Sequence, residues 1–308
     1  MALNLKELAS RPERFSAGHR ACAGCGFPLV IKMVLGSIKE PIVAACATGC
    51  MEVTSTIFPY TAWEIPFIHN AFENSAATMS GVEAAYQSLK RQGKIDKDIR
   101  FVAFGGDGGT YDIGFQSLSG AMERGHNMVY VCYDNGAYMN TGVQRSSATP
   151  RGSHTTTTPA GKVGKGKQQY RKDLALIMAA HGIPYVAQAS VGDLVDLARK
   201  AEKAFNVDGP AFLNVLTPCR LGWNVPADSV RDIAKEATDA CFWPLFEVEN
   251  GKWKVNYKPK NKIAMDDWMK QQGRFKHLFA PGNEDIRREI QEEVDRQWEA
   301  LLKRAEEA

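Results

Sequence analysis

The chain has 308 residues, of which 44% are hydrophobic and 24% are charged, and its formal net charge is +3. This balance argues against a nucleic-acid-binding protein, for which a strong basic excess is typical. No apolar run approaches the roughly 18–20 residues of a membrane span, and residues 1–7 lack the apolar stretch of a signal peptide. We therefore expect a cytoplasmic protein that binds neither membranes nor nucleic acid.

From residue 41 to about residue 216, apolar segments of strand length alternate with segments of helical character. This alternation predicts an α/β fold, with an open, mostly parallel sheet covered by helices on both faces. The expected strands are 42–45, 99–104, 128–133, 185–188 and 211–216, and the expected helices are 76–90, 174–181 and 194–205. The segment 112–118 predicts the opening of one further helix.

After residue 223 the pattern changes. The sequence predicts a helix over 229–241 and an exposed, alternating strand over 253–258. Apolar residues then recur every four positions, which predicts a C-terminal helix: Ile286, Ile290, Val294, Trp298 and Leu302. We predict two parts, a ligand-binding domain over 1–225 and a C-terminal extension over 226–308. The last helix of this extension packs on its own domain or on a partner.

Two expected strands end in polar segments that suit a metal-bound diphosphate, namely 105–109 and 134–137. The carboxyl ends of parallel strands meet at one edge of a sheet, where ligands bind. A hard cation such as Mg²⁺ prefers oxygen ligands, and three are available from Asp107, Asn135 and the carbonyl of Ala137. The alternative is a pair of ordinary turns, which Gly, Asp and Asn commonly form.

Four of the seven cysteines suit a metal centre: Cys22 and Cys25 in a C-x-x-C motif, Cys50 after Ala-Thr-Gly, and Cys219 after Thr-Pro. Four thiolates can ligate a zinc ion or a [4Fe–4S] cluster, and C-x-x-C can also be a redox dithiol. The spacing alone leaves zinc, a cluster and unrelated buried thiols open. The other cysteines match no ligand position and suit an apolar core: Cys46, Cys132 and Cys241.

The Gly-Asp-Gly turn and the Asn-containing segment together resemble the thiamine diphosphate motif. The wider pattern is similar to the beta subunits of the 2-oxoacid:ferredoxin oxidoreductases, above all those of pyruvate:ferredoxin oxidoreductase. The matching motifs lie at 18–26, 47–50, 106–109, 138–142 and 218–223, and the resemblance covers nearly the whole chain. Two residues depart from common patterns. Asp134 stands where many thiamine enzymes have Asn, and Arg220 stands where relatives often have Pro.

This resemblance implies a site for two cofactors within residues 1–225. Mg²⁺ would be held by Asp107, Asn135 and the Ala137 carbonyl, against a diphosphate that also approaches Gly106, Gly108 and Gly109. One [4Fe–4S] cluster would be held by Cys22, Cys25, Cys50 and Cys219. The family places Asn140 beside the thiazolium, and we expect Asn140 and Thr141 to be the catalytic residues of this chain.

The resemblance also implies oxidative decarboxylation of a 2-oxoacid, with electrons passing through the cluster to ferredoxin and the acyl group to coenzyme A. Pyruvate is the default substrate, although 2-oxoisovalerate, 2-oxoglutarate or oxalate would suit the same site. No motif supplies the glutamate that activates the pyrimidine. Partner subunits of the alpha, gamma and delta type are therefore expected, one with this glutamate and one with further clusters. The alternatives are a non-redox thiamine decarboxylase or synthase, and a zinc-stabilised structural subunit.

Residues 150–173 form an unusually long predicted loop, with four threonines at 155–158 and a stretch rich in glycine and lysine at 161–167. Loops of this length are usually functional or disordered. A solvated basic loop, a substrate contact and an ordered role at a subunit boundary all remain open. The stretch lacks the G-x-x-x-x-G-K-[ST] spacing, so we expect no nucleoside triphosphate site.

Overall fold

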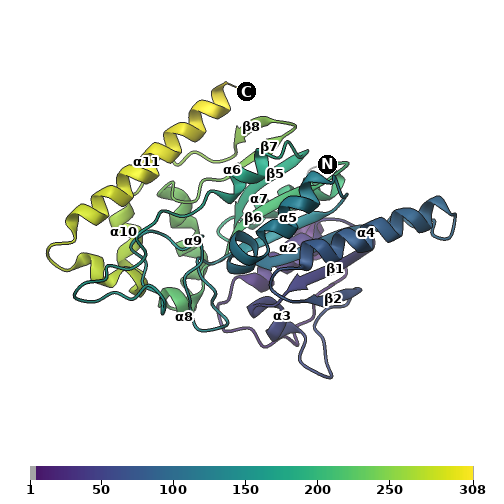
Figure 1. The fold of residues 1–308 in the computed structure, drawn as a ribbon, viewed down its shortest axis with the longest axis horizontal. Helices are drawn as coiled ribbons and strands as arrows, with labels where there is room; N and C mark the ends of the chain where they lie inside the picture. Colours follow the sequence, from purple (N-terminus) through teal and green to yellow (C-terminus); the bar gives the residue numbers. More distant parts are fainter. Residues whose placement is uncertain (1–4, 308) are drawn as a thin grey trace.

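A computed structural model describes residues 5–307 of the chain. Its eight strands are β1 (Ile42–Ala47), β2 (Phe67–Asn70), β3 (Arg100–Gly106), β4 (Val129–Asp134), β5 (Tyr185–Ser190), β6 (Ala211–Leu216), β7 (Phe246–Glu249) and β8 (Lys252–Val255). They form one sheet in the order β2-β1-β3-β4-β6-β5-β7-β8 (Figure 1). The first six strands are parallel, whereas β7 and β8 are antiparallel to their neighbours. The predicted fold class is confirmed.

Helices cover both faces of this sheet. They are α1 (Leu5–Ala9), α2 (Phe27–Gly36), α3 (Cys50–Ser55), α4 (Ser75–Arg91), α5 (Phe115–Glu123), α6 (Leu174–Ala179), α7 (Leu194–Asn206), α8 (Arg220–Trp223), α9 (Val230–Asp239), α10 (Met265–Lys270) and α11 (Glu284–Glu306), with a π-helix at Gly109–Ile113 and a 3₁₀-helix at Gly273–Phe279. Between residues 5 and 307, no helix combines the length and the apolar character needed to cross a membrane.

Successive strand residues point into two separate cores, as the pleat of a strand requires. In β3, Val102 and Phe104 belong to the core that contains α2, α7 and α9. Ala103 lies between them and belongs to the core that contains α4, α5 and α6. Because β3 and β4 are buried on both faces, their sequences are continuous apolar runs.

The predicted helix opening at 112–118 differs from the structure in detail. The π-helix Gly109–Ile113 comes first and α5 begins only at Phe115. The wider turn brings Gly114 against Gly109, whose carbonyl oxygen accepts a hydrogen bond from the Gly114 N–H at 2.6 Å. A π-bulge inside a helix is frequent at functional sites. Here it lies directly behind the glycine turn that follows β3.

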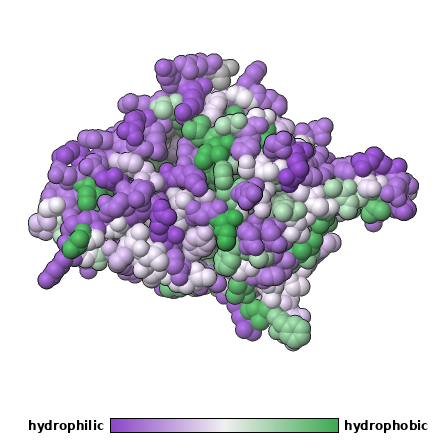
Figure 2. Space-filling model, in the orientation of Figure 1, coloured by the Kyte–Doolittle hydropathy of each residue, from purple (hydrophilic) through white to green (hydrophobic). Residues whose placement is uncertain are grey.

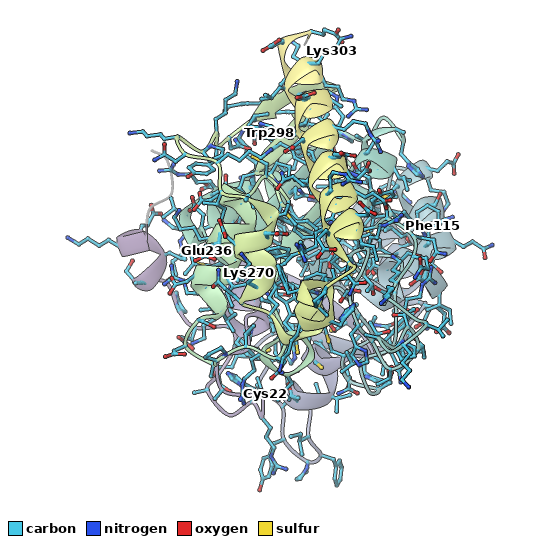
Figure 3. The ribbon with its side chains drawn as sticks, turned by 90° about the vertical axis from the view of Figure 1, so that its left-hand side faces the viewer. Cys22, Phe115, Glu236, Lys270, Trp298 and Lys303 are labelled. Carbon is cyan, nitrogen blue, oxygen red and sulfur yellow. The ribbon has the colours of Figure 1, made fainter. Side chains whose placement is uncertain are left out.

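The C-terminal residues contribute to the same sheet. β7 pairs with β5, and β8 pairs with β7, so the hairpin extends the parallel strands by two antiparallel ones. The long α11 buries Ile290, Val294 and Leu301 against the two cores. Figure 3 follows α11 past Trp298 to Lys303, at the end of the molecule opposite Cys22. The division at residue 225 remains a prediction.

Glu247 of β7 gives a pH-dependent contribution to stability. Burial alone would raise its pKa, but hydrogen bonds from Lys203, Tyr185 and Asn256 lower the pKa to about 2. A carboxyl with a lowered pKa stabilises the fold above its ordinary pKa and loses that effect as the pH falls toward 2. We expect Glu247→Gln to lower the free energy of unfolding by up to about 3 kcal/mol at pH 7. In urea titrations this difference should shrink steadily below pH 4.5.

Glu249→Gln is the matched control, because Glu249 is half exposed and its Lys203 contact is 3.3 Å long. Exposed ion pairs contribute about 0–1 kcal/mol. An equal loss of stability in both variants, or a Glu247→Gln effect that does not change with pH, would contradict this role of Glu247.

Candidate active site

A hollow of about 340 Å³ opens at the carboxyl edge of the sheet, where ligands of open parallel sheets bind. It lies between the turn at the end of β3 (residues 105–109, the β3 turn) and the loop after β4 (residues 135–142, the β4 loop). Nine of the predicted site residues line it: Cys50, Gly106, Asp107, Gly108, Gly109, Asn135, Ala137, Asn140 and Thr141.

Other lining residues are not among the predicted ones: Thr48, Gly49, Phe72, Tyr133, Tyr138 and Met139. Tyr138 and Met139 belong to the β4 loop, so their position in that motif could have identified them. Phe72 follows β2 and carries no chemical signal in the sequence. Three predicted residues, Cys22, Cys25 and Cys219, do not line the hollow.

Three potential metal ligands converge at one point of the hollow. One end of the Asn135 side-chain amide lies 3.0 Å from Asp107 Oδ1 and 3.0 Å from the Ala137 carbonyl oxygen. With nitrogen at this position, the amide donates to both oxygens. With oxygen there, three oxygen atoms would face one another, an arrangement that a cation between them would stabilise. This donor set of one carboxylate, one amide and one carbonyl fits Mg²⁺.

Asp107 is fully buried, and its carboxylate oxygens accept hydrogen bonds from the Asn135 N–H at 3.2 Å and the Ser146 hydroxyl at 2.5 Å. Burial raises its pKa well above the ordinary value, the charge of Asp134 raises it further, and the two hydrogen bonds lower it. A buried carboxylate of this kind needs a positive charge beside it to remain ionised. A divalent cation bound by Asp107, Asn135 and the Ala137 carbonyl would provide that charge.

Close packing explains two glycines of the β3 turn. A Cβ atom on Gly108 would lie 2.4 Å from the ring of Tyr138, and one on Gly109 would lie 2.7 Å from the Phe72 carbonyl oxygen. Neither position has room for a side chain, so the backbone itself forms the floor of the hollow. Backbone N–H groups at the start of a helical segment suit the binding of a phosphate.

The four predicted cysteine ligands share one neighbourhood. Burial, together with the charges of Cys219, Cys50 and Cys22, raises the pKa of Cys25 to about 12. Burial likewise raises the pKa of Cys50 to about 11, with contributions from Cys219 and Cys22. These thiols are therefore protonated at neutral pH, and metal ions would bind them only with release of their protons. Among residues 5–307, no three His, Cys, Asp or Glu side chains form a group that could hold a metal ion.

The cysteines and the hollow are joined by direct contacts. The Asn140 side chain lines the hollow beside Cys50, and its amide lowers the pKa of the thiol against the effect of burial. The indole N–H of Trp223, four residues after Cys219, donates to the Asn135 carbonyl oxygen at 2.6 Å. Thr141 lies at the edge of the hollow with its hydroxyl bonded to Gln144 at 2.5 Å.

Gly24, between Cys22 and Cys25, cannot carry a side chain. Its φ is +76°, and a Cβ atom would lie 2.1 Å from the Ala227 carbonyl oxygen. We expect Gly24→Ala to displace the C-x-x-C segment and to lower the iron content of the purified protein at least several-fold. Gly18→Ala is the control, because its Cβ would meet only the Ser16 hydroxyl, at 3.7 Å. Equal iron in both variants would show that the segment holds no metal.

Comparison with known proteins places these residues in a family. The model of the thiamine pyrophosphate enzyme, C-terminal TPP binding domain, matches residues 47–215. The pyruvate synthase subunit PorB of Thermotoga maritima is 51% identical, over 98% of this chain and 96% of its own length. The ketoisovalerate oxidoreductase subunit VorB of Pyrococcus furiosus is 41% identical, over 98% and 97%.

Among solved structures, the chain is similar to the 2-oxoglutarate:ferredoxin oxidoreductase from Magnetococcus marinus. The TM-score is 0.56 at 22% identity, over 72% of this chain and 79% of that chain, a similarity of fold. The domain match covers more than half of the chain, and the PorB similarity covers nearly all of it. The chain therefore belongs to the thiamine pyrophosphate enzymes, and within them to the family of the pyruvate synthase PorB subunits.

Proposed function

We propose that this chain is the thiamine diphosphate-binding subunit of a pyruvate:ferredoxin oxidoreductase. Such an enzyme decarboxylates pyruvate oxidatively, passes the electrons to ferredoxin and transfers the acyl group to coenzyme A. Identity to a pyruvate synthase subunit is 51%, against 41% to a ketoisovalerate oxidoreductase subunit, which supports pyruvate over a branched 2-oxoacid. Bound thiamine diphosphate supplies the carbon nucleophile and stabilises the negative charge that decarboxylation leaves.

One observation carries this proposal: Cys50 lines the same hollow as Asp107 and Asn140. On one side of the hollow, Asp107, Asn135 and the Ala137 carbonyl would hold Mg²⁺, and the glycines of the β3 turn would accommodate the diphosphate. On the other side, Cys50 would be one of four ligands of a [4Fe–4S] cluster. Asn140 contacts that ligand, so it would lie between the reacting carbon and the cluster.

A cluster explains the position of the cysteines better than zinc does. Oxidative decarboxylation releases electrons that must leave the site, and an iron–sulfur cluster can take them up one at a time. Zinc has no redox function. We assign the cluster to Cys22, Cys25, Cys50 and Cys219, and the catalytic contacts with substrate to Asn140 and Thr141.

Several exposed apolar side chains of this chain suit contact with a partner subunit. Apolar side chains are exposed on the segments that carry the site, including Ile113 behind the β3 turn and Leu221 beside Cys219. Phe58 and Tyr60 are 94% and 77% exposed in the chain between α3 and β2, which forms the apolar projection at the lower edge of Figure 2. We assign the partners to alpha-, gamma- and delta-type subunits, and the whole complex to the cytoplasm. One partner would supply the glutamate that contacts the pyrimidine, and another the clusters that reduce ferredoxin.

The test is an assay of the complex purified anaerobically with its native partners. We expect bound thiamine diphosphate, iron and acid-labile sulfide, and reduction of a dye by pyruvate and coenzyme A that exceeds the rate with 2-oxoisovalerate, 2-oxoglutarate or oxalate. Thiamine without iron would indicate a non-redox decarboxylase or synthase. Zinc without thiamine would indicate a structural subunit, and faster turnover of another 2-oxoacid would reassign the substrate.

A further inference from the structure

Two carboxylates are buried side by side beneath the hollow, at the ends of neighbouring strands. Asp107 follows β3 and Asp134 ends β4, and their exposed fractions are 0% and 2%. Of the two, only Asp107 contributes an oxygen atom to the proposed Mg²⁺ site. The Asp134 carboxylate points to the other side, where its Oδ2 accepts hydrogen bonds from the Tyr111 hydroxyl and from Arg171, both at 2.7 Å.

Arg171 comes from the long segment between β4 and α6, and it is held on both sides. Its Nη2 also donates to the Tyr111 hydroxyl at 2.8 Å, and its guanidinium lies 4.4 Å from the ring centre of Trp243. The side chain is only 14% exposed, so the ion pair with Asp134 is largely shielded from water. A pair of this kind is costly to break, since one buried charge would remain without a partner.

The other oxygen of Asp134 binds the backbone of the β4 loop. Its Oδ1 accepts the Gly136 N–H at 3.0 Å. Gly136 has φ +77°, and its carbonyl oxygen accepts the Thr149 hydroxyl at 2.7 Å. This turn determines the direction of the two residues on either side of Gly136, which are Asn135 and Ala137. Asn135 and the Ala137 carbonyl are two of the three proposed metal ligands, and the third is Asp107.

We propose that Arg171 is a positioning residue for the metal: it neutralises Asp134 and so holds the turn that presents Asn135 and Ala137 to Mg²⁺. This inference rests on the proposed function. The segment 150–173 therefore has an ordered role behind the cofactor site. Lys167 of the same segment binds the chain that follows the β4 loop: its ammonium donates to the Ser147 and Thr149 carbonyl oxygens at 3.1 and 2.6 Å.

The test is a titration of the purified complex, stripped of metal, with Mg²⁺ at a fixed concentration of thiamine diphosphate. The readout is the thiamine retained after gel filtration, which does not depend on turnover. Loss of a residue that orients a metal ligand typically costs 10–100-fold in metal affinity. We expect Arg171→Met to raise the half-saturating Mg²⁺ concentration by about that factor, and Arg171→Lys by less, because the charge is kept.

Asp134→Asn combined with Arg171→Met separates charge pairing from packing. With a neutral side chain at position 134 the counter-charge is no longer needed, so the double variant should return to within about three-fold of the wild-type value. Arg151→Met is the matched control, since Arg151 pairs with Glu289 and lies 4.9 Å from the Tyr170 ring centre in the same segment, without contacting Asp134.

Unchanged Mg²⁺ dependence in Arg171→Met would overturn the inference while leaving the proposed function intact. The inference would also be overturned if Asp134→Asn with Arg171→Met needed as much Mg²⁺ as Arg171→Met alone, because Arg171 would then act only through packing. A wild-type complex that retains no thiamine at any Mg²⁺ concentration would refute the proposed function, and this role of Arg171 with it.

Discussion

Replacing Asp107 with alanine is expected to lower the affinity of the complex for thiamine diphosphate by more than about 100-fold, the upper effect of removing a residue that merely orients a ligand. Asp107 is the only charged member of the converging oxygens, so its loss removes the main attraction for Mg²⁺. The iron content should not change, because Asp107 accepts its hydrogen bonds from Asn135 and Ser146 and not from a cysteine. Thiamine and iron are both measured on the same purified complex.

Asp208→Ala is the control for this variant. Asp208 lies before β6, at the opposite edge of the sheet, is exposed and accepts a hydrogen bond from Asn127 at 3.2 Å. It should retain thiamine fully. Asp107→Ala should also fold at least as well as wild type in the absence of metal, because it removes a buried carboxyl whose pKa burial raises. Normal thiamine stoichiometry in Asp107→Ala would refute the metal assignment.

Replacing Cys50 with alanine is expected to abolish the spectroscopic signal of one [4Fe–4S] cluster. Cys50 begins α3 and lines the hollow, so its loss removes one of four ligands on the side that faces the proposed thiamine site. Thiamine should still bind, because the three oxygen ligands are unaffected. Electron paramagnetic resonance of the reduced complex and an iron assay provide the measurement, and dye reduction by pyruvate should fall to background.

Cys46→Ala is the matched control, four residues earlier in the same segment. Cys46 is fully buried in β1, packs in the core that contains α2, α7 and α9, and its thiol donates to the Ala47 carbonyl oxygen at 3.5 Å. Its truncation should lower stability slightly through lost packing and leave the iron content unchanged. An unchanged cluster signal in Cys50→Ala, or the same iron loss in both variants, would contradict the assignment of Cys50 as a ligand.

The buried strands could be predicted because they carry their burial in their own sequence. The segment 211–216 is apolar at every position except Asn214, and the structure has β6 at Ala211–Leu216. Phe67–Asn70 has only two apolar residues, and β2 exists because it pairs with β1. Phe27–Gly36 is largely apolar, and short runs of this kind do not distinguish a helix from a strand. Such elements depend on neighbours that are distant in sequence.

In the candidate site, too, some residues could be predicted from the sequence and others could not. The residues that line the hollow lie in local motifs whose chemistry is visible in the sequence, such as the β3 turn around Asp107. The residues that support them do not. Ser146 lies 39 residues from Asp107, Trp223 lies 88 residues from Asn135, and each contributes a single hydrogen bond. Nothing near Ser146 or Trp223 in the sequence indicates these partners, because only the fold brings them together.

The two outer strands limit how this chain can associate with others. β2 has only four residues, and β8 presents the charged side chains of Lys252 and Lys254 to solvent. Short or lysine-bearing edge strands are poor templates for a foreign strand, which protects a sheet from edge-to-edge aggregation. Assembly with other polypeptides is therefore directed away from backbone pairing and toward side-chain contacts, which can distinguish one partner from another.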